Sequence, residues 1–260
     1  MIAALLHADT RRWFELHVIE TTASTNSDLL RDAARLPSGS VLVAEHQTAG
    51  RGRRGRTWIA PTGGSLTFSL LWKFRCNLAK LSGLSLAIGV GAARALEQCG
   101  VTGVHLKWPN DLLARRSGDW CKLGGILVEV TGESAGTVGA VIGIGLNLDL
   151  GQAAAGIDQP VTDLRCLGGV TSRNVVLAAL LTQLAAILPT FSLDGFAPLA
   201  AEWNRRHAWA GERVQLAPDN GLVASVAGVA RGVADDGALQ IETPTGVTRI
   251  VSGDVSLRVV

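Results

Sequence analysis

The fold is decided by two apolar segments, GGILVEV at residues 124–130 and TVGAVIGIGLNL at residues 137–148. Polar and apolar residues hardly alternate in either segment, which predicts β-strands that are buried on both faces. Residues 131–136 between them are short and polar, so the two strands are predicted to form an antiparallel hairpin.

Further elements are predicted on both sides of this hairpin. Strands are expected at 13–19, 40–45, 65–73 and 103–108. Helices are expected from a cap at Ser24 or Thr25 to about Leu36, and at 78–98, 173–189 and 194–208. The longest apolar run, 175–188, is shorter than the ~20 residues that cross a bilayer. It is therefore predicted to be a buried helix, and no membrane partner is expected.

The pattern changes after Gly211, where short β-type segments alternate with turn residues such as Asp236-Gly237. The segments are 212–217, 222–231, 238–243, 247–251 and 255–260. This spacing predicts a small barrel of about 50 residues. We therefore expect two domains, 1–210 and 211–260.

The charges are unevenly distributed, although the formal net charge of the 260 residues is only +2. Residues 46–96 contain no Asp or Glu but carry eight of the 24 lysines and arginines. A localised anion site explains this better than a general polyanion-binding surface. The four cysteines have neither metal-ligand spacing nor a disulfide pattern, which predicts reduced thiols in the cytoplasm and no protein metal site. The first residues do not have the pattern of a signal peptide.

The strongest candidate for a functional site is GRGRRGRTW at residues 50–58. Glycines between the arginines let the backbone curl, so that guanidinium and N–H groups converge on one anion. Arginine is suited to carboxylate and phosphate oxygens, and Trp58 could stack on a purine. A solvated basic loop or a nucleic-acid-binding run remains an alternative for this stretch taken alone.

Three further clusters carry polar residues at the ends of predicted strands: KWPND at 107–111, KLGGILVE at 122–129 and GIGLN at 143–147. Each also has an ordinary structural explanation. The first could be a strand exit with a tight turn, and the second a solvated lysine beside a strand. The third could be a β-bulge or a strand end.

Together, these motifs occur in the order and approximate spacing of the bacterial biotin–protein ligases, which the sequence resembles from about residue 13 to Arg258. The resemblance implies an α+β fold with two parts. The first is a mixed sheet flanked by helices, similar to class II aminoacyl-tRNA synthetases, and the second is a small SH3-like β-barrel. Few residues precede the first predicted strand, so we expect a short form that lacks the N-terminal DNA-binding domain of some relatives and does not bind DNA.

The resemblance also implies site residues. Those for biotin are Ser24, Thr25, Asn26, Gln47, Arg51, Gly52, Arg53 and Lys122. Those for the nucleotide are Arg56, Trp58, Lys107, Asn110 and Asn147. Lys122 and Arg53 are expected to act in catalysis together with Asp111, which would receive the acceptor lysine. ATP and Mg²⁺ are the implied cofactors.

The implied reaction has two steps. The biotin carboxylate attacks the α-phosphorus of ATP to give biotinyl-5′-AMP, and a carrier lysine then attacks this anhydride. The first nucleophile is already ionised near neutral pH and needs no general base, whereas the lysine must lose a proton. Asp111 could orient that lysine or deprotonate it.

The implied protein partner is the biotin carboxyl carrier protein of acetyl-CoA carboxylase or of a related carboxylase. A homodimer is possible, because the strand at 137–146 could pair across a two-fold axis or lie inside the sheet. Two other functions are considered: a lipoate–protein ligase or related acyltransferase of the same fold, and a nucleic-acid-binding module.

Overall fold

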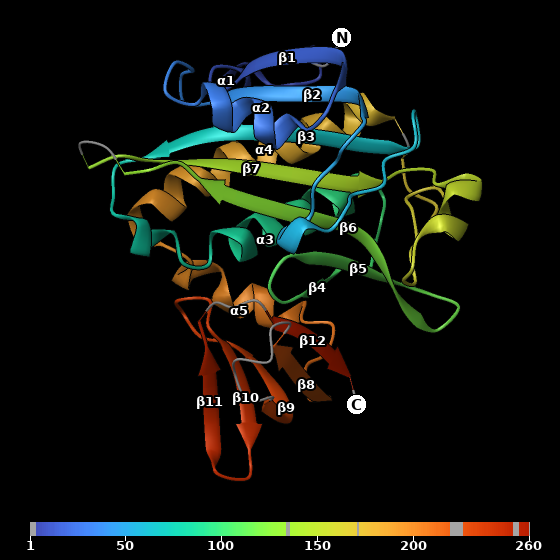
Figure 1. The fold of residues 1–260 in the computed structure, drawn as a ribbon, viewed down its shortest axis with the longest axis vertical. Helices are drawn as coiled ribbons and strands as arrows, with labels where there is room; N and C mark the ends of the chain where they lie inside the picture. Colours follow the sequence, from blue (N-terminus) through green and yellow to red (C-terminus); the bar gives the residue numbers. More distant parts are fainter. Residues whose placement is uncertain (1–3, 134–135, 171, 219–225, 252–254, 260) are drawn as a thin grey trace.

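The computed structural model describes residues 4–133, 136–170, 172–218, 226–251 and 255–259. Its strands form two sheets, a mixed seven-stranded sheet and a five-stranded antiparallel sheet. In Figure 1 the smaller sheet lies below the larger one, with helix α5 between them. The predicted α+β class, with a mixed sheet flanked by helices, is confirmed.

The large sheet has the order β1-β2-β3-β7-β6-β5-β4, in which β1 and β2 are parallel and all other neighbours antiparallel. Its strands are β1 (Glu15–Thr22), β2 (Ser40–Gln47), β3 (Ser65–Phe74), β4 (His105–Lys107), β5 (Asp111–Arg116), β6 (Asp119–Val130) and β7 (Val138–Asn147). The helices are α1 (Ala8–Arg11), α2 (Thr25–Asp32), α3 (Leu84–Gln98), α4 (Arg173–Asp194) and α5 (Ala197–Arg205). Short 3-10 turns are η2 (Arg53–Gly55), η3 (Leu78–Leu81) and η4 (Gly151–Gly156).

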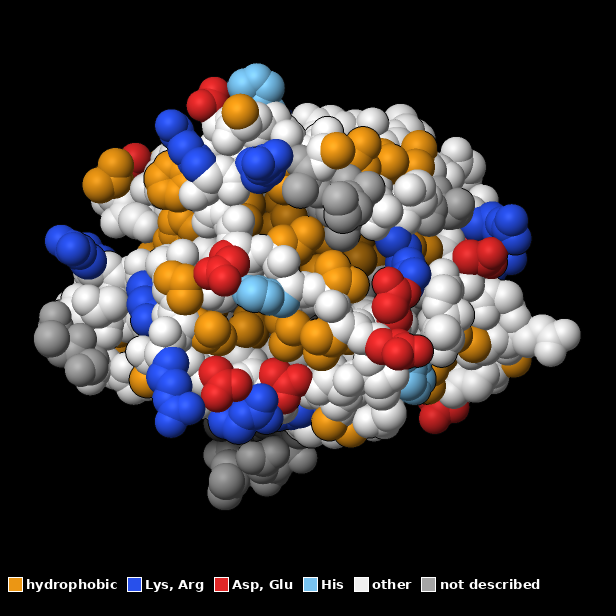
Figure 2. Space-filling view, turned by 90° about the horizontal axis from the view of Figure 1, so that it is seen from above, with side chains coloured by type: hydrophobic (Ala, Val, Ile, Leu, Met, Phe, Trp, Pro, Cys, Tyr) orange, Lys and Arg blue, Asp and Glu red, His pale blue; other side chains and the backbone are white. Residues whose placement is uncertain are grey.

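The predicted hairpin is present as β6 and β7, and it is central. Because β3 and β6 pair with the two edges of β7, this strand has no free edge for a second molecule. The possibility that 137–146 pairs across a two-fold axis is therefore wrong, and the alternative that it lies inside the sheet is correct. The edge strand of the large sheet at the end nearest β2 and β3 is β1. Figure 2 shows that charged side chains of both signs are spread over the face around it, with hydrophobic side chains between them.

The two faces of the large sheet are covered differently. One face packs on α3 and α4 and forms the main core, which includes Phe68, Ile142 and Ile144, while α5 packs on α3 and on the smaller sheet. The other face carries the short helix α2, over a small cluster that contains Leu71 and Val141. Since α2 covers only part of this face, the rest is available for a site.

Helices α3 and α4 are the long apolar elements of the chain. Together with the preceding turn, α3 spans Leu78–Gln98, and α4 spans Arg173–Asp194, so both are long and apolar enough to cross a membrane. They pack against each other, and the buried shares of their apolar windows are 56% and 50%. This packing is typical of core helices, in agreement with the buried helix predicted around 175–188.

The C-terminal sheet contains β8 (Arg213–Pro218), β9 (Val226–Val233), β10 (Leu239–Thr243), β11 (Gly246–Ile250) and β12 (Val255–Val259). Its order is β11-β10-β9-β8-β12. The two outer strands do not pair with each other among the described residues, so the predicted closed barrel is not found. The predicted strand at 222–231 lies partly outside the described residues, and β9 begins at Val226.

Strand β5 was not predicted. Its sequence DLLARR contains a short apolar stretch that ends in charge, and it becomes a strand because it pairs with β4 on one side and β6 on the other. This pairing also extends β6 back to Asp119, before the predicted start at residue 124. Tertiary pairing therefore adds a strand that the apolar pattern does not show.

Candidate active site

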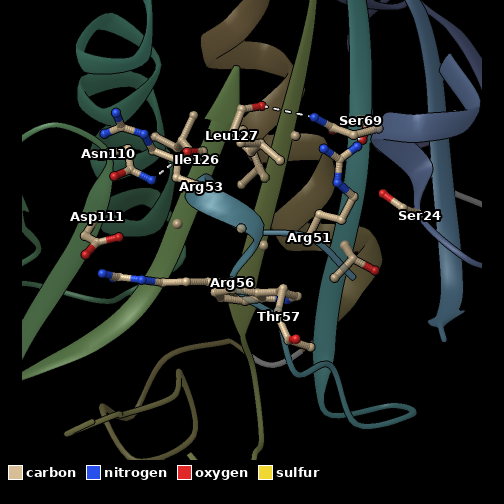
Figure 3. Close-up of a pocket in the computed structure, with 18 of the residues that line it drawn as sticks. Ser24, Arg51, Arg53, Arg56, Thr57, Ser69, Asn110, Asp111, Ile126 and Leu127 are labelled. Atoms are coloured by element: carbon tan, nitrogen blue, oxygen red, sulfur yellow. Dashed lines mark hydrogen bonds between the residues drawn. The ribbon is translucent and has the colours of Figure 1, made fainter. Parts of the chain in front are cut away.

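A pocket opens on the α2 face of the large sheet, between α2, the loop at residues 50–58 and the turn that joins β4 to β5. Figure 3 shows its two sides, with Ser24, Arg51 and Ser69 on one, Asn110 and Asp111 on the other, and Arg53 and Arg56 between them. It is lined by thirteen of the fourteen predicted site residues: Ser24, Thr25, Asn26, Gln47, Arg51, Gly52, Arg53, Arg56, Trp58, Lys107, Asn110, Asp111 and Lys122.

Small residues on one face of the central strands make room for this pocket. In β7, Gly143 and Gly145 face the site, while the bulky residues between and beside them face the core. A Cβ at Gly143 would lie 2.2 Å from Oδ1 of Asn26, and one at Gly145 would lie 2.5 Å from the Trp58 ring. The predicted strand with two buried faces thus has one densely packed face and one hollow face.

One end of the pocket is lined by uncharged polar groups that hydrogen-bond to one another. The backbone N–H of Thr25 donates to Oε1 of Gln47 at 2.8 Å, and the hydroxyls of Thr25 and Ser69 are 2.7 Å apart. The Ser69 hydroxyl donates to Oδ1 of Asn26 at 2.5 Å. Ser24 caps α2 by accepting from the N–H of Ser27. These buried side chains suit a ligand that offers both N–H and C=O groups.

The loop at residues 50–58 has a defined path across the pocket. The backbone N–H of Trp58 donates to the Gly50 carbonyl at 2.9 Å, and Arg51 pairs with Thr57, so the loop closes as a narrow hairpin. Arg54 adopts a left-handed conformation with φ 61° in the turn η2. Arg51, Arg53, Arg54 and Arg56 all line the pocket.

The four arginines of this loop are not equivalent. Nη2 of Arg51 lies 3.1 Å from Oε1 of Glu129, and its Nη1 donates to the Ser27 hydroxyl. Its charge is therefore already balanced by a protein carboxylate. Arg53, Arg54 and Arg56 also line the pocket. Of the other basic residues in the acid-free segment 46–96, Arg94 lies away from the pocket and pairs with Glu202.

Lys122 is not the solvated lysine that the sequence left open as an alternative, because it is paired with a carboxylate. Its Nζ lies 2.8 Å from Oδ1 of Asp111, and both side chains are largely buried, with 19% and 17% exposure. The same Nζ is 5.8 Å from the centre of the Trp58 ring. β5 and β6 place the two residues together by pairing Asp111 with Gly125, which has no side chain to separate them.

Two further lining residues are held by neighbouring groups of the protein. Nδ2 of Asn110 donates to the Ile126 carbonyl at 2.8 Å, which fixes the β4–β5 turn on β6. The ammonium of Lys107 lies 4.6 Å above the ring of Trp209, a cation–π contact that directs the lysine stem.

Asn147 is the predicted site residue that does not line the pocket. It is buried, and its Nδ2 donates to the carbonyls of Lys122 and Thr162, at 3.3 and 3.1 Å. These bonds connect β7 to the loop around Thr162. The backbone of this loop hydrogen-bonds to the backbone of Lys122 in β6. Burial would raise the pKa of Asp163 in this loop, but the backbone N–H groups of Cys166 and Leu150 donate to its carboxylate and hold the pKa below the usual value.

Two residues of the site were missed from the sequence. Ser69 is fully buried in the middle of β3 and lines the pocket, and Glu129 joins Asn26 to Arg51. For Ser69 the available signal was an alternation of size along β3, where the small residues Ser65, Thr67 and Ser69 alternate with large apolar ones.

Comparisons with known proteins agree with this geometry. The sequence profile of the "Biotin/lipoate A/B protein ligase family" matches residues 17–147, and that of the "Biotin protein ligase C terminal domain" matches residues 211–258. The "Bifunctional ligase/repressor BirA" of Escherichia coli K12 is 35% identical over 242 residues, which cover 93% of this chain and 73% of the relative. The "Biotin--[acetyl-CoA-carboxylase] ligase" of Mycobacterium tuberculosis is also 35% identical, with 94% of this chain and 89% of the relative covered.

Among solved structures, the biotin protein ligase from Aquifex aeolicus in complex with biotin and ATP superposes with a TM-score of 0.79 at 29% identity. The match covers 95% of this chain and 99% of that one. On the evidence of profile, sequence identity and fold together, the chain belongs to the biotin/lipoate A/B protein ligase family.

Proposed function

We propose that this protein is an ATP-dependent biotin–protein ligase. It forms biotinyl-5′-AMP from biotin and ATP, and then transfers biotin to a lysine of the biotin carboxyl carrier domain of a carboxylase. The observation that carries this proposal is the division of one pocket into a neutral hydrogen-bonding end and a cationic end. A ureido ring fits the first end, and a carboxylate with a polyphosphate fits the second.

The neutral end also distinguishes biotin from lipoate. Thr25, Asn26 and Ser69 are buried, and they present hydroxyl and amide groups toward the pocket. A dithiolane ring has no hydrogen-bonding group of comparable strength, so lipoate would leave the remaining lone pairs of these groups, such as those of the Thr25 hydroxyl, without a ligand partner. Biotin offers N–H and C=O groups to them. The arginine loop lines this pocket, which favours a small anionic ligand over a nucleic-acid strand.

In the first step the residues of this pocket position two anions and stabilise their charge. Lys122 and Arg53 contact the biotin carboxylate and the α-phosphate, and Arg56 and Lys107 contact the nucleotide. Trp58 stacks on the purine, while its ring rests on Gly145. Asn147 acts indirectly, because its side-chain amide donates to the backbone carbonyl of Lys122 and holds that residue in place.

In the second step Asp111 receives the acceptor lysine. While Lys122 on β6 is paired with the Asp111 carboxylate, the carboxylate is held in place as a hydrogen-bond acceptor. When Lys122 turns to the anhydride, Asp111 is available to orient the incoming ammonium and accept a proton from it.

Mg²⁺ would arrive with the nucleotide. Among the described residues no group of three or more His, Cys, Asp or Glu side chains is arranged to hold a metal. Asp111 is the one carboxylate among the described lining residues, and Asn110 beside it offers an amide oxygen. This donor set fits a Mg²⁺ held mainly by phosphates, where it would neutralise their charge.

We further propose a cytoplasmic enzyme with a carrier protein of acetyl-CoA carboxylase or a related carboxylase as its partner. We also propose a domain boundary near residue 210 and an SH3-like C-terminal domain. The cysteines support the location, because Cys99 and Cys121 are buried free thiols and burial raises the pKa of both. The five antiparallel strands beyond Gly211 support the domain assignment.

The test is incubation with ATP–Mg²⁺ and biotin, lipoate or an oligonucleotide, with pyrophosphate release as the readout. Biotin should give adenylate and then label a carrier domain. Adenylation of lipoate with an equal or higher kcat/KM, or no adenylate from either acid, would overturn the proposal.

A further inference from the structure

Glu129 is a largely buried carboxylate next to the pocket to which the proposed reaction gives no role. Its side chain is 23% exposed and does not belong to the pocket lining. One oxygen accepts from Nδ2 of Asn26 at 2.9 Å, and the other lies 3.1 Å from Nη2 of Arg51. A carboxylate at this depth is costly unless it is paired, so both contacts are required by its position.

The contact with Asn26 sets the direction of the hydrogen bonds at the neutral end of the pocket. Nδ2 of Asn26 faces two acceptors, Glu129 and the Leu127 carbonyl, so its Oδ1 faces Ser69. The Ser69 hydroxyl then donates to Oδ1 and cannot donate to Thr25, so the Thr25 hydroxyl donates to Ser69 or to Oε1 of Gln47. Thr25 therefore presents lone pairs to the pocket, which suits a ligand N–H.

The contact with Arg51 anchors the arginine loop at its base. Arg51 is the first arginine of the loop, and its guanidinium reaches both Glu129 on β6 and the Ser27 hydroxyl on α2. The following residues, 52–57, lie across the pocket. An anchor at this position holds the closed path of the loop over a bound ligand.

We propose that Glu129 is a positioning residue that links the neutral end of the pocket to the arginine loop. This inference rests on the proposed function. Through Asn26 and Ser69 it fixes the Thr25 hydroxyl as an acceptor for the ligand N–H, and through Arg51 it keeps the loop closed over biotinyl-5′-AMP. Because it touches neither the carboxylate nor the phosphates, Glu129 acts on binding and retention of the ligand and not on bond formation.

The test uses Glu129→Gln in the full chain. The amide oxygen of glutamine can still accept from Asn26, so the packing is kept, while the ion pair with Arg51 is lost. We expect the KM for biotin to rise about 10-fold, with kcat of adenylate formation within about 3-fold of the original. Release of preformed adenylate, measured after rapid dilution of the complex, should be about 10-fold faster than in the wild-type protein. The matched control is Glu97→Gln, which removes the ion pair between Glu97 on α3 and Arg206, neither of which lines the pocket.

A second variant, Arg51→Gln, together with the double variant, completes a double-mutant cycle. If the two residues act as a pair, the double variant should release adenylate no faster than the more impaired single variant. Wild-type protein that forms no adenylate from biotin would refute the proposed function itself. If the wild-type protein is active but Glu129→Gln has the same KM for biotin and the same rate of adenylate release, this inference alone is overturned. The same holds if Glu129→Gln has a lower melting temperature but neither kinetic change.

Discussion

Lys122 provides the sharpest test of the cationic end, because its ion pair with Asp111 changes what its removal should do. Lys122→Ala should delete the proposed charge-assisted contact to the reacting anions, worth about 1.5–3 kcal/mol, or about 10- to 150-fold in rate. It also leaves the Asp111 carboxylate, which is 17% exposed, without the ammonium 2.8 Å away. Two like charges about 4 Å apart repel by up to about 4 kcal/mol at an effective dielectric constant of ~20.

The two effects add, so Lys122→Ala should slow adenylate formation by roughly 10³-fold or more. The double variant Lys122→Ala/Asp111→Asn removes the repulsive carboxylate as well, and it should be slowed by only about 10- to 150-fold. Biotin-dependent pyrophosphate release measures this step without the acceptor lysine. The control is Lys80→Ala, an exposed lysine outside the pocket lining. An unchanged rate in Lys122→Ala refutes the role of this lysine, and a double variant slower than the single refutes the electrostatic coupling.

Three further results are expected. Arg53→Gly should still form adenylate but release it early, because the loop loses a charge-assisted contact and gains backbone freedom, so biotin on an unrelated lysine-rich protein should increase severalfold. Gly145→Ala places a Cβ 2.5 Å from the Trp58 ring, so the KM for ATP should rise more than 10-fold while the KM for biotin changes less, as initial rates at varied substrate would show. Burial lowers the pKa of His207 to about 4, so the folded state excludes a proton that the unfolded state binds below pH 6.5. The free energy of unfolding should therefore fall by about 2 kcal/mol between pH 7.5 and pH 5, and by about 3 kcal/mol in total near pH 4. Urea denaturation of His207→Phe should show a flatter pH dependence in this window.

Local patterns in the chain predicted most of the elements and most of the residues that line the pocket. Apolar runs predicted the strands that became β2, β3, β6 and β7, since burial of apolar side chains is a local property of the chain. The glycines and arginines of 50–58 predicted an anion-binding loop, because guanidinium and backbone N–H groups on a curled backbone can converge on one anion. The pocket lining contains every predicted site residue except Asn147, whose amide is used inside the protein to hold two carbonyls.

Tertiary structure decided which residues meet across the sheet. Lys122 and Asp111 are eleven positions apart, and only the pairing of β5 with β6 places them in contact. Glu129 reaches Asn26 and Arg51 because β6 lies opposite α2, which no local pattern records. Strand order also removed the free edge of β7, and the outer strands of the C-terminal sheet remain unpaired with each other in the described part of the chain. Composition and periodicity specify what a segment can bury, whereas charge pairing and strand edges depend on neighbours that are distant in sequence.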